Sequence, residues 1–114
     1  MSFKLRSFRQ DILFNAQTIN ATVYSKTISL DEVEGPASVQ LVWINGATVD
    51  MDVSLQFSNN GSDWTTVATT TTNITTNADS IFWDFSTGAE FVRIEVAVTT
   101  GSADFSAFFN GKSR

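Results

Sequence analysis

Carboxylates are the residues of this sequence whose spacing most directly suggests chemistry. Asp50 and Asp52 stand two positions apart in an alternating segment, and a second acidic group comprises Asp31, Glu32 and Glu34. Residues two apart on a strand share a face, with Cα atoms roughly 7 Å apart, a separation that the two carboxylates of a glycosidase can have. Catalysis would also need a cleft and one raised pKa, and an exposed strand face provides neither. Calcium suits these oxygens better, but we expect a solvated acidic face rather than a metal site.

Other catalytic constellations are missing from the sequence. It contains no histidine and no cysteine, which removes the commonest general base and all thiol chemistry. There is no phosphate-binding loop and no spacing typical of metal ligands. The sequence therefore predicts a protein that is not an enzyme and that uses no cofactor.

The stretch 57–67, FSNNGSDWTTV, allows two interpretations. Asn60-Gly61 is a hairpin signal because both residues tolerate positive φ, and the Asp63 carboxylate can accept hydrogen bonds from turn N–H groups. In a structural interpretation, Phe57 and Trp64 lie at the same end of the hairpin and close the core. In a functional one, Trp64 is a stacking platform for a sugar ring, with further exposed aromatic residues drawn from Trp43, Trp83 and Tyr24. We predict the core position for Trp64 and for most of the others.

Strands must position these residues. Apolar and polar residues alternate throughout 47–58, with apolar side chains at Val49, Met51, Val53, Leu55 and Phe57, as in a strand with one buried face. Segment 91–100 repeats this pattern, and the shorter strand candidates are 11–19, 21–30, 38–44, 81–86 and 103–109. The tract 69–77 favours an edge strand or a wide loop, and Pro36 is predicted to lie in a turn. This order predicts an all-β fold: a single β-sandwich of about seven to eight antiparallel strands, with jelly-roll or related Greek-key topology.

Charge is unevenly distributed along the chain. The formal net charge is −5, which argues against non-specific binding to nucleic acid or to an anionic membrane. Basic residues gather near both ends, at Lys4, Arg6, Arg9, Lys112 and Arg114, and only Lys26 and Arg93 lie between them. Charged ends are often merely solvated. The alternative is that they dock on an acidic partner or on the body of a neighbouring subunit.

The second alternative divides the chain into a basic N-terminal arm, residues 1–10, and a sandwich domain, residues 11–114. The predicted partner-binding residues of the arm combine apolar anchors with basic groups: Phe3, Leu5 and Phe8 with Lys4, Arg6 and Arg9. No secretory signal or membrane-spanning segment is recognisable in the sequence. We therefore expect synthesis in a host cytoplasm without export.

The order of motifs resembles a known group of proteins. "LQFSNNGSDWTTV", a polar tract, "FVRIEVAVTTG" and a closing "SAFFNGKS" are similar to the pattern of small β-sandwich proteins in the virions of tailed bacteriophages. A shorter part, 53–97, resembles discoidin-type (coagulation factor 5/8 C-type) domains, although this chain lacks their cysteines. Because the shared motif is structural, no binding residue can be transferred from either group.

The phage resemblance implies a virion structural protein, and we interpret it as a capsid decoration (cement) protein located in the virion. Its partners would be the major capsid protein or other virion proteins, and it would form a homo-oligomer, with a trimer favoured. The alternative is a carbohydrate-binding module of a phage tail or head fibre, with a glycan as ligand. A bacterial adhesion domain is disfavoured because no signal peptide is recognisable.

Overall fold

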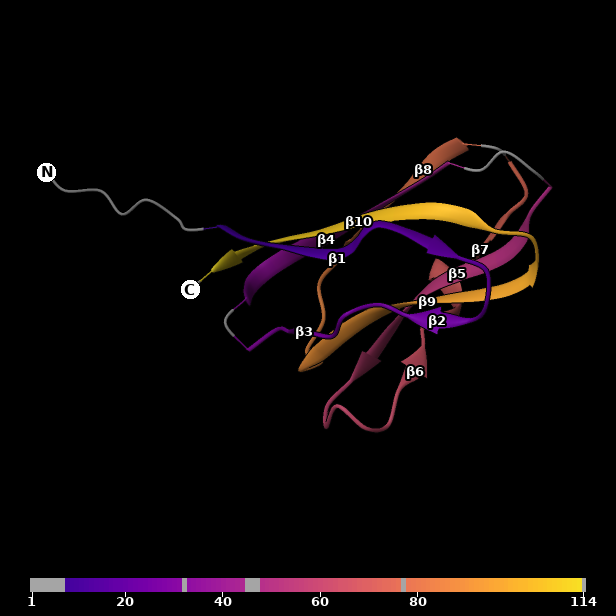
Figure 1. Ribbon diagram of the computed structural model, residues 1–114. Coiled ribbons are helices and arrows are strands. Elements are labelled where there is room, and N and C mark those ends of the chain that lie inside the picture. Colours follow the sequence, from indigo (N-terminus) through magenta and orange to yellow (C-terminus); the bar gives the residue numbers. More distant parts are fainter. Residues whose placement is uncertain (1–7, 32, 45–47, 77, 114) are drawn as a thin grey trace, which may run out of the picture.

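A computed structural model describes residues 8–31, 33–44, 48–76 and 78–113. Almost all of them belong to strands or to the short connections between strands (Figure 1). The elements are β1 (Phe8–Ile19), β2 (Val23–Tyr24), β3 (Ile28–Ser29), β4 (Val33–Ile44), β5 (Asp50–Ser58), β6 (Thr65–Thr66), η1 (Ala68–Thr70), β7 (Thr72–Ile74), β8 (Ala78–Phe85), β9 (Phe91–Thr100) and β10 (Ala103–Ser113). Within this part of the chain, no helix is long and apolar enough to cross a membrane.

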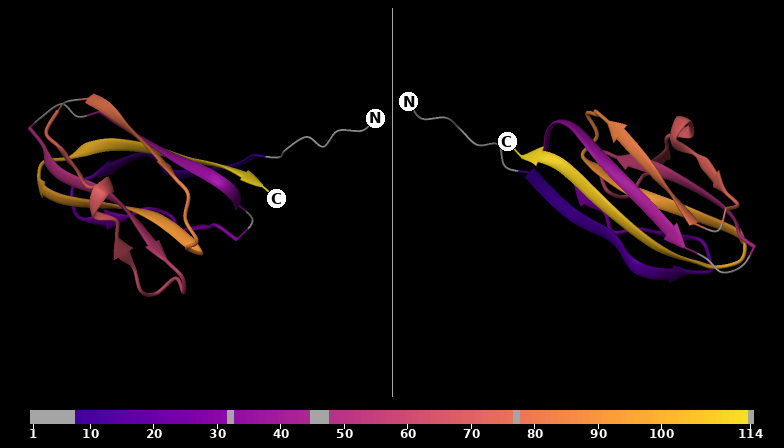
Figure 2. Two further views of the ribbon diagram at one scale, coloured as in Figure 1. Left: turned by 180° about the vertical axis from the view of Figure 1, so that it is seen from behind. Right: turned by 90° about the horizontal axis from the view of Figure 1, so that it is seen from above.

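The strands form two antiparallel sheets that pack face to face (Figures 1 and 2). Sheet A has the order β1-β10-β4-β8. Sheet B has the order β2-β9-β5-β6, with β3 also pairing with β9 and β7 also pairing with β5. Since β2 and β3 share one partner, and β6 and β7 share another, each pair acts as one interrupted edge strand. Over the described residues this gives the two four-stranded sheets of a jelly roll, as the sequence predicts.

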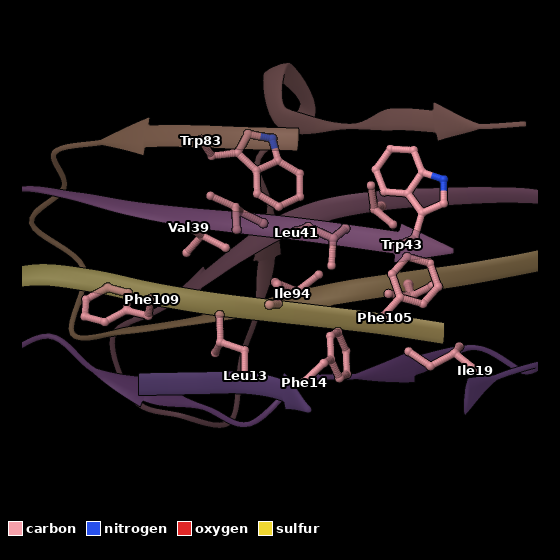
Figure 3. Close-up of a cluster of buried hydrophobic side chains, with 14 of the residues drawn as sticks. Leu13, Phe14, Ile19, Val39, Leu41, Trp43, Trp83, Ile94, Phe105 and Phe109 are labelled. Atoms are coloured by element: carbon pink, nitrogen blue, oxygen red, sulfur yellow. The ribbon is translucent and has the colours of Figure 1, made fainter. Parts of the chain in front are cut away.

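The core lies between the sheets and follows the predicted alternation. Met51, Val53 and Leu55 of β5 are completely buried, and they face the opposite sheet together with alternate residues of β9. Sheet A contributes buried side chains from all four of its strands, among them Val39, Leu41, Phe105, Phe109 and Phe14 (Figure 3). Burial of this many large apolar side chains is the main stabilising contribution to the fold.

Two tryptophans belong to this core, as predicted. Trp43 and Trp83 are almost completely buried, and each indole N–H donates a hydrogen bond to a backbone carbonyl. The acceptor of Trp43 Nε1 is the oxygen of Thr76, and that of Trp83 Nε1 is the oxygen of Thr70, both at 3.2 Å. These satisfied, buried rings cannot serve as platforms for a ligand.

The ends of several strands differ from the prediction. β4 begins at Val33, so Pro36 lies within a strand rather than in a turn. A register shift between Gly111 and Ser113 on β10 accompanies this irregular stretch, and such bulges accommodate residues that a regular ladder does not. The described part of the predicted tract, residues 69–76, contains the end of η1 and the short edge strand β7, in keeping with its prediction.

β1 begins at Phe8, earlier than the predicted boundary. Phe8, Arg9 and Gln10 pair with Lys112, Gly111 and Asn110 of β10. The predicted arm of residues 1–10 therefore overlaps the first strand by its last three residues. Phe3, Lys4, Leu5 and Arg6 lie outside the described residues.

Candidate interaction surfaces

The acidic pair on β5 is held by an amide group from the neighbouring strand. Asn73 of β7 lies opposite Asp52, and its Nδ2 donates hydrogen bonds to Asp50 Oδ1 and to Asp52 Oδ1, both at 2.8 Å. Asp31 of the second acidic group accepts a hydrogen bond from the Ser29 hydroxyl at 2.8 Å. Over the described ranges, no group of three or more potential metal-ligating side chains comes together. The carboxylate pair thus has a structural role in joining β5 to β7.

Side chains stabilise the turn between β5 and β6. Ser58 Oγ accepts the N–H groups of Asn60 and Gly61, and Asn60 Oδ1 accepts those of Ser62 and Asp63, with all four distances between 2.8 and 3.2 Å. Gly61 has a φ of 76°, a conformation that glycine adopts without steric cost. The predicted hairpin is therefore present, since Phe57 pairs with Thr65. The acceptors of the turn N–H groups, however, are Ser58 and Asn60, and the predicted acceptor Asp63 instead accepts a hydrogen bond from Asn60 Nδ2 at 2.8 Å.

Trp64 does not lie in the core, contrary to the prediction. It is half-buried and does not belong to the buried cluster. The pairing explains why: Thr65 is opposite Phe57 and shares its inward face, so Trp64, one residue earlier, points to the outer face. Phe57 packs instead against Phe85, with ring centroids 5.3 Å apart in an edge-to-face arrangement.

On the outer face of sheet B, Trp64 forms a stack with Arg93 and Tyr24, which we call the Arg93 stack. The guanidinium carbon of Arg93 lies 4.1 Å from the centroid of the Trp64 ring and 3.9 Å from that of the Tyr24 ring. Arg93 Nε also donates to Gln56 Oε1 at 2.8 Å, and Gln56 Nε2 donates to Thr66 Oγ1 at 3.0 Å. The stack thus holds strands β2, β9, β5 and β6 together across one surface through cation–π contacts and hydrogen bonds.

The outer face of sheet A has a different character. Ile12 pairs with Phe108, Phe108 pairs with Gln40, and Gln40 pairs with Phe82. These four residues form one row across all four strands, which we call the sheet A row. Its three apolar members are 51%, 45% and 60% exposed in the order Ile12, Phe108, Phe82, and they line a groove of about 780 Å³. In the right-hand view of Figure 2, β1 (indigo), β10 (yellow) and β4 (purple) lie side by side, and no other described segment crosses their outer face.

A group of charges borders the groove at β1. Asp11 accepts a hydrogen bond from Lys26 Nζ at 2.9 Å and forms an ion pair with Arg9 at 3.3 Å. The Lys26 hydrogen bond is the main cause that lowers the pKa of the Asp11 carboxyl, partly opposed by burial and aided by the charges of Lys26 and Arg9. Arg9 also donates to the backbone oxygen of Ser29. Arg9, predicted as a partner-binding residue of the arm, therefore has its hydrogen bonds within the domain.

Sequence reasoning missed the sheet A row, although part of its signal was present. Phe108 and Phe82 have the opposite parity to the buried Phe109 and Trp83 on the same strands, so alternation alone would have placed them outside. That they lie in one row follows only from the pairing of strands that are far apart in the sequence.

Comparisons with known proteins identify the fold. Neither protein-family models nor curated protein sequences give a match. Among solved structures, the chain is similar to the SPBc2 prophage-derived protein YomS, with a TM-score of 0.66 and 13% identity over 97% of this chain and 99% of that one. It is also similar to VP2 in a subviral particle of infectious bursal disease virus, with a TM-score of 0.63 and 11% identity over 96% of this chain. This chain spans about a third of VP2, 33% of its length.

A third similar structure is that of Bacillus endospore appendages, described as disulfide-linked pili, with a TM-score of 0.57 and 12% identity over 100% of this chain and 96% of that one. At these identities the likeness establishes a shared jelly-roll fold. It agrees with the predicted resemblance to β-sandwich proteins of phages at the level of the fold, and it gives no support to the discoidin resemblance.

Proposed function

We propose that this protein is a non-enzymatic virion structural protein, and specifically a capsid decoration protein that binds the head shell of a phage particle. The sheet A row carries the proposal. Clusters of exposed large apolar side chains on a small soluble domain are uncommon and mark interaction surfaces. Here Ile12, Phe108 and Phe82 form such a cluster across an entire sheet.

The fold similarities favour a virion as the setting. A prophage-derived protein matches the chain along nearly its whole length, and a virus particle protein contains a domain of the same fold. Fold alone does not determine function, but the described surfaces agree with a structural role. The paired carboxylates of β5 are engaged by Asn73, and the Arg93 stack links strands of one sheet.

Co-sedimentation with undecorated phage heads tests the proposal. The wild-type protein should pellet with the heads at a fixed copy number per particle. Phe82→Asp should reduce binding at least tenfold, because it places a charge within the sheet A row. Ser102→Asp adds the same charge at an exposed position between β9 and β10, and it should bind as the wild type does. Absence of wild-type binding, or equal binding by both variants, would refute the proposal.

A second candidate function, carbohydrate binding, is favoured by one observation. Tyr24 is 46% exposed and lies with Trp64 on the same outer face, on either side of the Arg93 guanidinium in the stack. Aromatic rings beside a planar polar group are suited to contacting a sugar ring, and the jelly-roll fold also occurs in lectins. A glycan array on which Tyr24→Ala removes a signal, while Phe82→Asp keeps it, would favour this function over the first.

A further inference from the structure

We infer that the sheet A row of one copy binds the N-terminal segment 1–7 of another copy, and that three copies close into a ring through this contact. The inference rests on the proposed function as a virion structural protein, and it specifies a second copy of this chain as the partner that covers the apolar face. It draws on the chemistry of the segment, its length, its position in the chain and the charge of the body.

The segment has the side chains that the row requires. In MSFKLRS, Phe3 and Leu5 stand two apart, so an extended chain places both on one side, roughly 7 Å from each other. The row crosses three intervals between strands, or about 14 Å. Seven extended residues span roughly 23 Å, which is long enough for the segment to lie along the row and bring both apolar side chains onto it.

Charge favours the same pairing. The segment carries two of the seven basic residues, Lys4 and Arg6, and none of the twelve acidic ones, so the remainder of the chain has a formal net charge of −7. Asp84 of β8 and Asp104 of β10 lie on the outer face of sheet A, on the same side as the row, but Lys112 of β10 lies beside Asp84 and Lys26 lines the groove. The electrostatic attraction therefore comes from the net charge of the body rather than from an acidic cluster at the row, and the apolar side chains of the segment supply the anchors.

The position of the segment points to a neighbouring copy as the acceptor. Residue 7 directly precedes Phe8, the first residue of β1, and Ile12 of the row follows on the same strand. To lie on its own row, the segment would have to reverse sharply just before Phe8. Of the residues that support tight reversals, residues 1–9 contain only Ser2 and Ser7, whose turn preference is weaker, and no Gly, Pro, Asn or Asp.

A contact between the segment and the row is heterologous, because each copy contributes its segment to one neighbour and its row to another. Repetition of such a contact closes into a ring if the rotation between copies allows it. In such a ring each row is covered by a neighbour's segment, so the shell meets other surfaces of three copies at once, and this multivalency raises the affinity for a symmetric capsid. Phe82→Asp would then weaken head binding by breaking the ring.

A complementation experiment tests the inference. The segment variant, Phe3→Asp with Leu5→Asp, keeps an intact row, and the row variant, Phe82→Asp with Phe108→Asp, keeps an intact segment. Both altered row residues are exposed, so the row variant should keep the wild-type circular dichroism spectrum and melting temperature. Sedimentation velocity of the wild-type protein should give a trimer.

Each variant alone should sediment as a monomer, because its affinity for further copies of itself should be at least tenfold lower than that of the wild type. An equimolar mixture should form a heterodimer, because the intact segment of one variant can bind the intact row of the other. Ser2→Asp with Ser7→Asp adds the same two charges to the segment without removing an anchor, and it should retain more self-association than the segment variant.

Two results would overturn the inference. One is a wild-type protein that stays monomeric at about 100 μM, and the other is a mixture of variants that stays monomeric. The second result, combined with loss of phage-head binding by Phe82→Asp, would mean that the row contacts the shell directly, and the proposed function would stand without the ring. Complementation without head binding would leave the ring in place and refute the decoration function.

Discussion

Replacement of Trp64 by alanine separates the observed position of this residue from the predicted one. A buried tryptophan in the core would cost about 3–5 kcal/mol on truncation. Trp64 is only half-buried, and its main identified partner is the Arg93 guanidinium, 4.1 Å from the ring centroid. A cation–π contact contributes about 0.5–2 kcal/mol depending on desolvation. We therefore expect Trp64→Ala to lower the free energy of unfolding by about 1–2 kcal/mol.

Urea denaturation at neutral pH, followed by far-ultraviolet circular dichroism, measures this difference. Trp43→Ala is the matched control, because Trp43 is 4% exposed and its loss should cost about 3–5 kcal/mol. A double-mutant cycle with Arg93→Met should give a coupling energy of about 0.5–2 kcal/mol between residues 64 and 93. Equal costs for the two tryptophan variants, or a coupling energy near zero, would contradict the surface stack.

Two further predictions concern the stability of the domain. Gly101 has a φ of 87°, and a Cβ built there lies 2.4 Å from the Thr48 oxygen, so Gly101→Ala should lower the free energy of unfolding by about 2–4 kcal/mol in urea denaturation. The control is Gly88→Ala, where a Cβ meets nothing within 4 Å, and it should change the free energy of unfolding by less than about 0.5 kcal/mol. Equal effects of the two substitutions would contradict the close approach at Gly101. The pKa of Asp11 is lowered in the folded protein, so its contribution to stability is present above pH about 4 and is lost as the pH falls through the lower, folded-state pKa. The melting temperature of Asp11→Asn should therefore lie below that of the wild type at pH 7 and approach it at pH 2, and a constant difference would exclude this linkage.

The fold could be predicted largely because its strands have regular alternation. In β5 and β9, apolar residues occur at every second position and face the core, although the intervening Ser54, Gln56 and Ser58 of β5 are buried as well. The ends of strands were harder to predict, because pairing overrides local turn preferences there. Gly35-Pro36 has the composition of a turn, yet the adjacent Ala37 pairs with Gly111 on one side and Phe85 on the other, which keeps this stretch within β4.

The error at Trp64 has a specific physical origin. The sequence identifies the turn at Asn60-Gly61, but the direction of a side chain after a turn depends on how many residues the loop contains. Because Thr65 pairs with Phe57, Trp64 falls on the outer face, where Arg93 and Tyr24 cover part of it. A register one residue further along, with Thr66 opposite Phe57, would have reversed that direction and brought the indole inward.

The two outer faces of the sandwich also differ in a way that only the register reveals. On sheet B, the outer side chains satisfy one another: Arg93 bonds to Gln56, Gln56 bonds to Thr66, and aromatic rings stack on the guanidinium. On sheet A, residues from four distant parts of the chain meet in one row, and only Gln40 among them is polar. An apolar row of this kind gains stability only when something covers it. Because the outer side chains of sheet B already bind one another, this asymmetry supports our proposal that the protein assembles through sheet A.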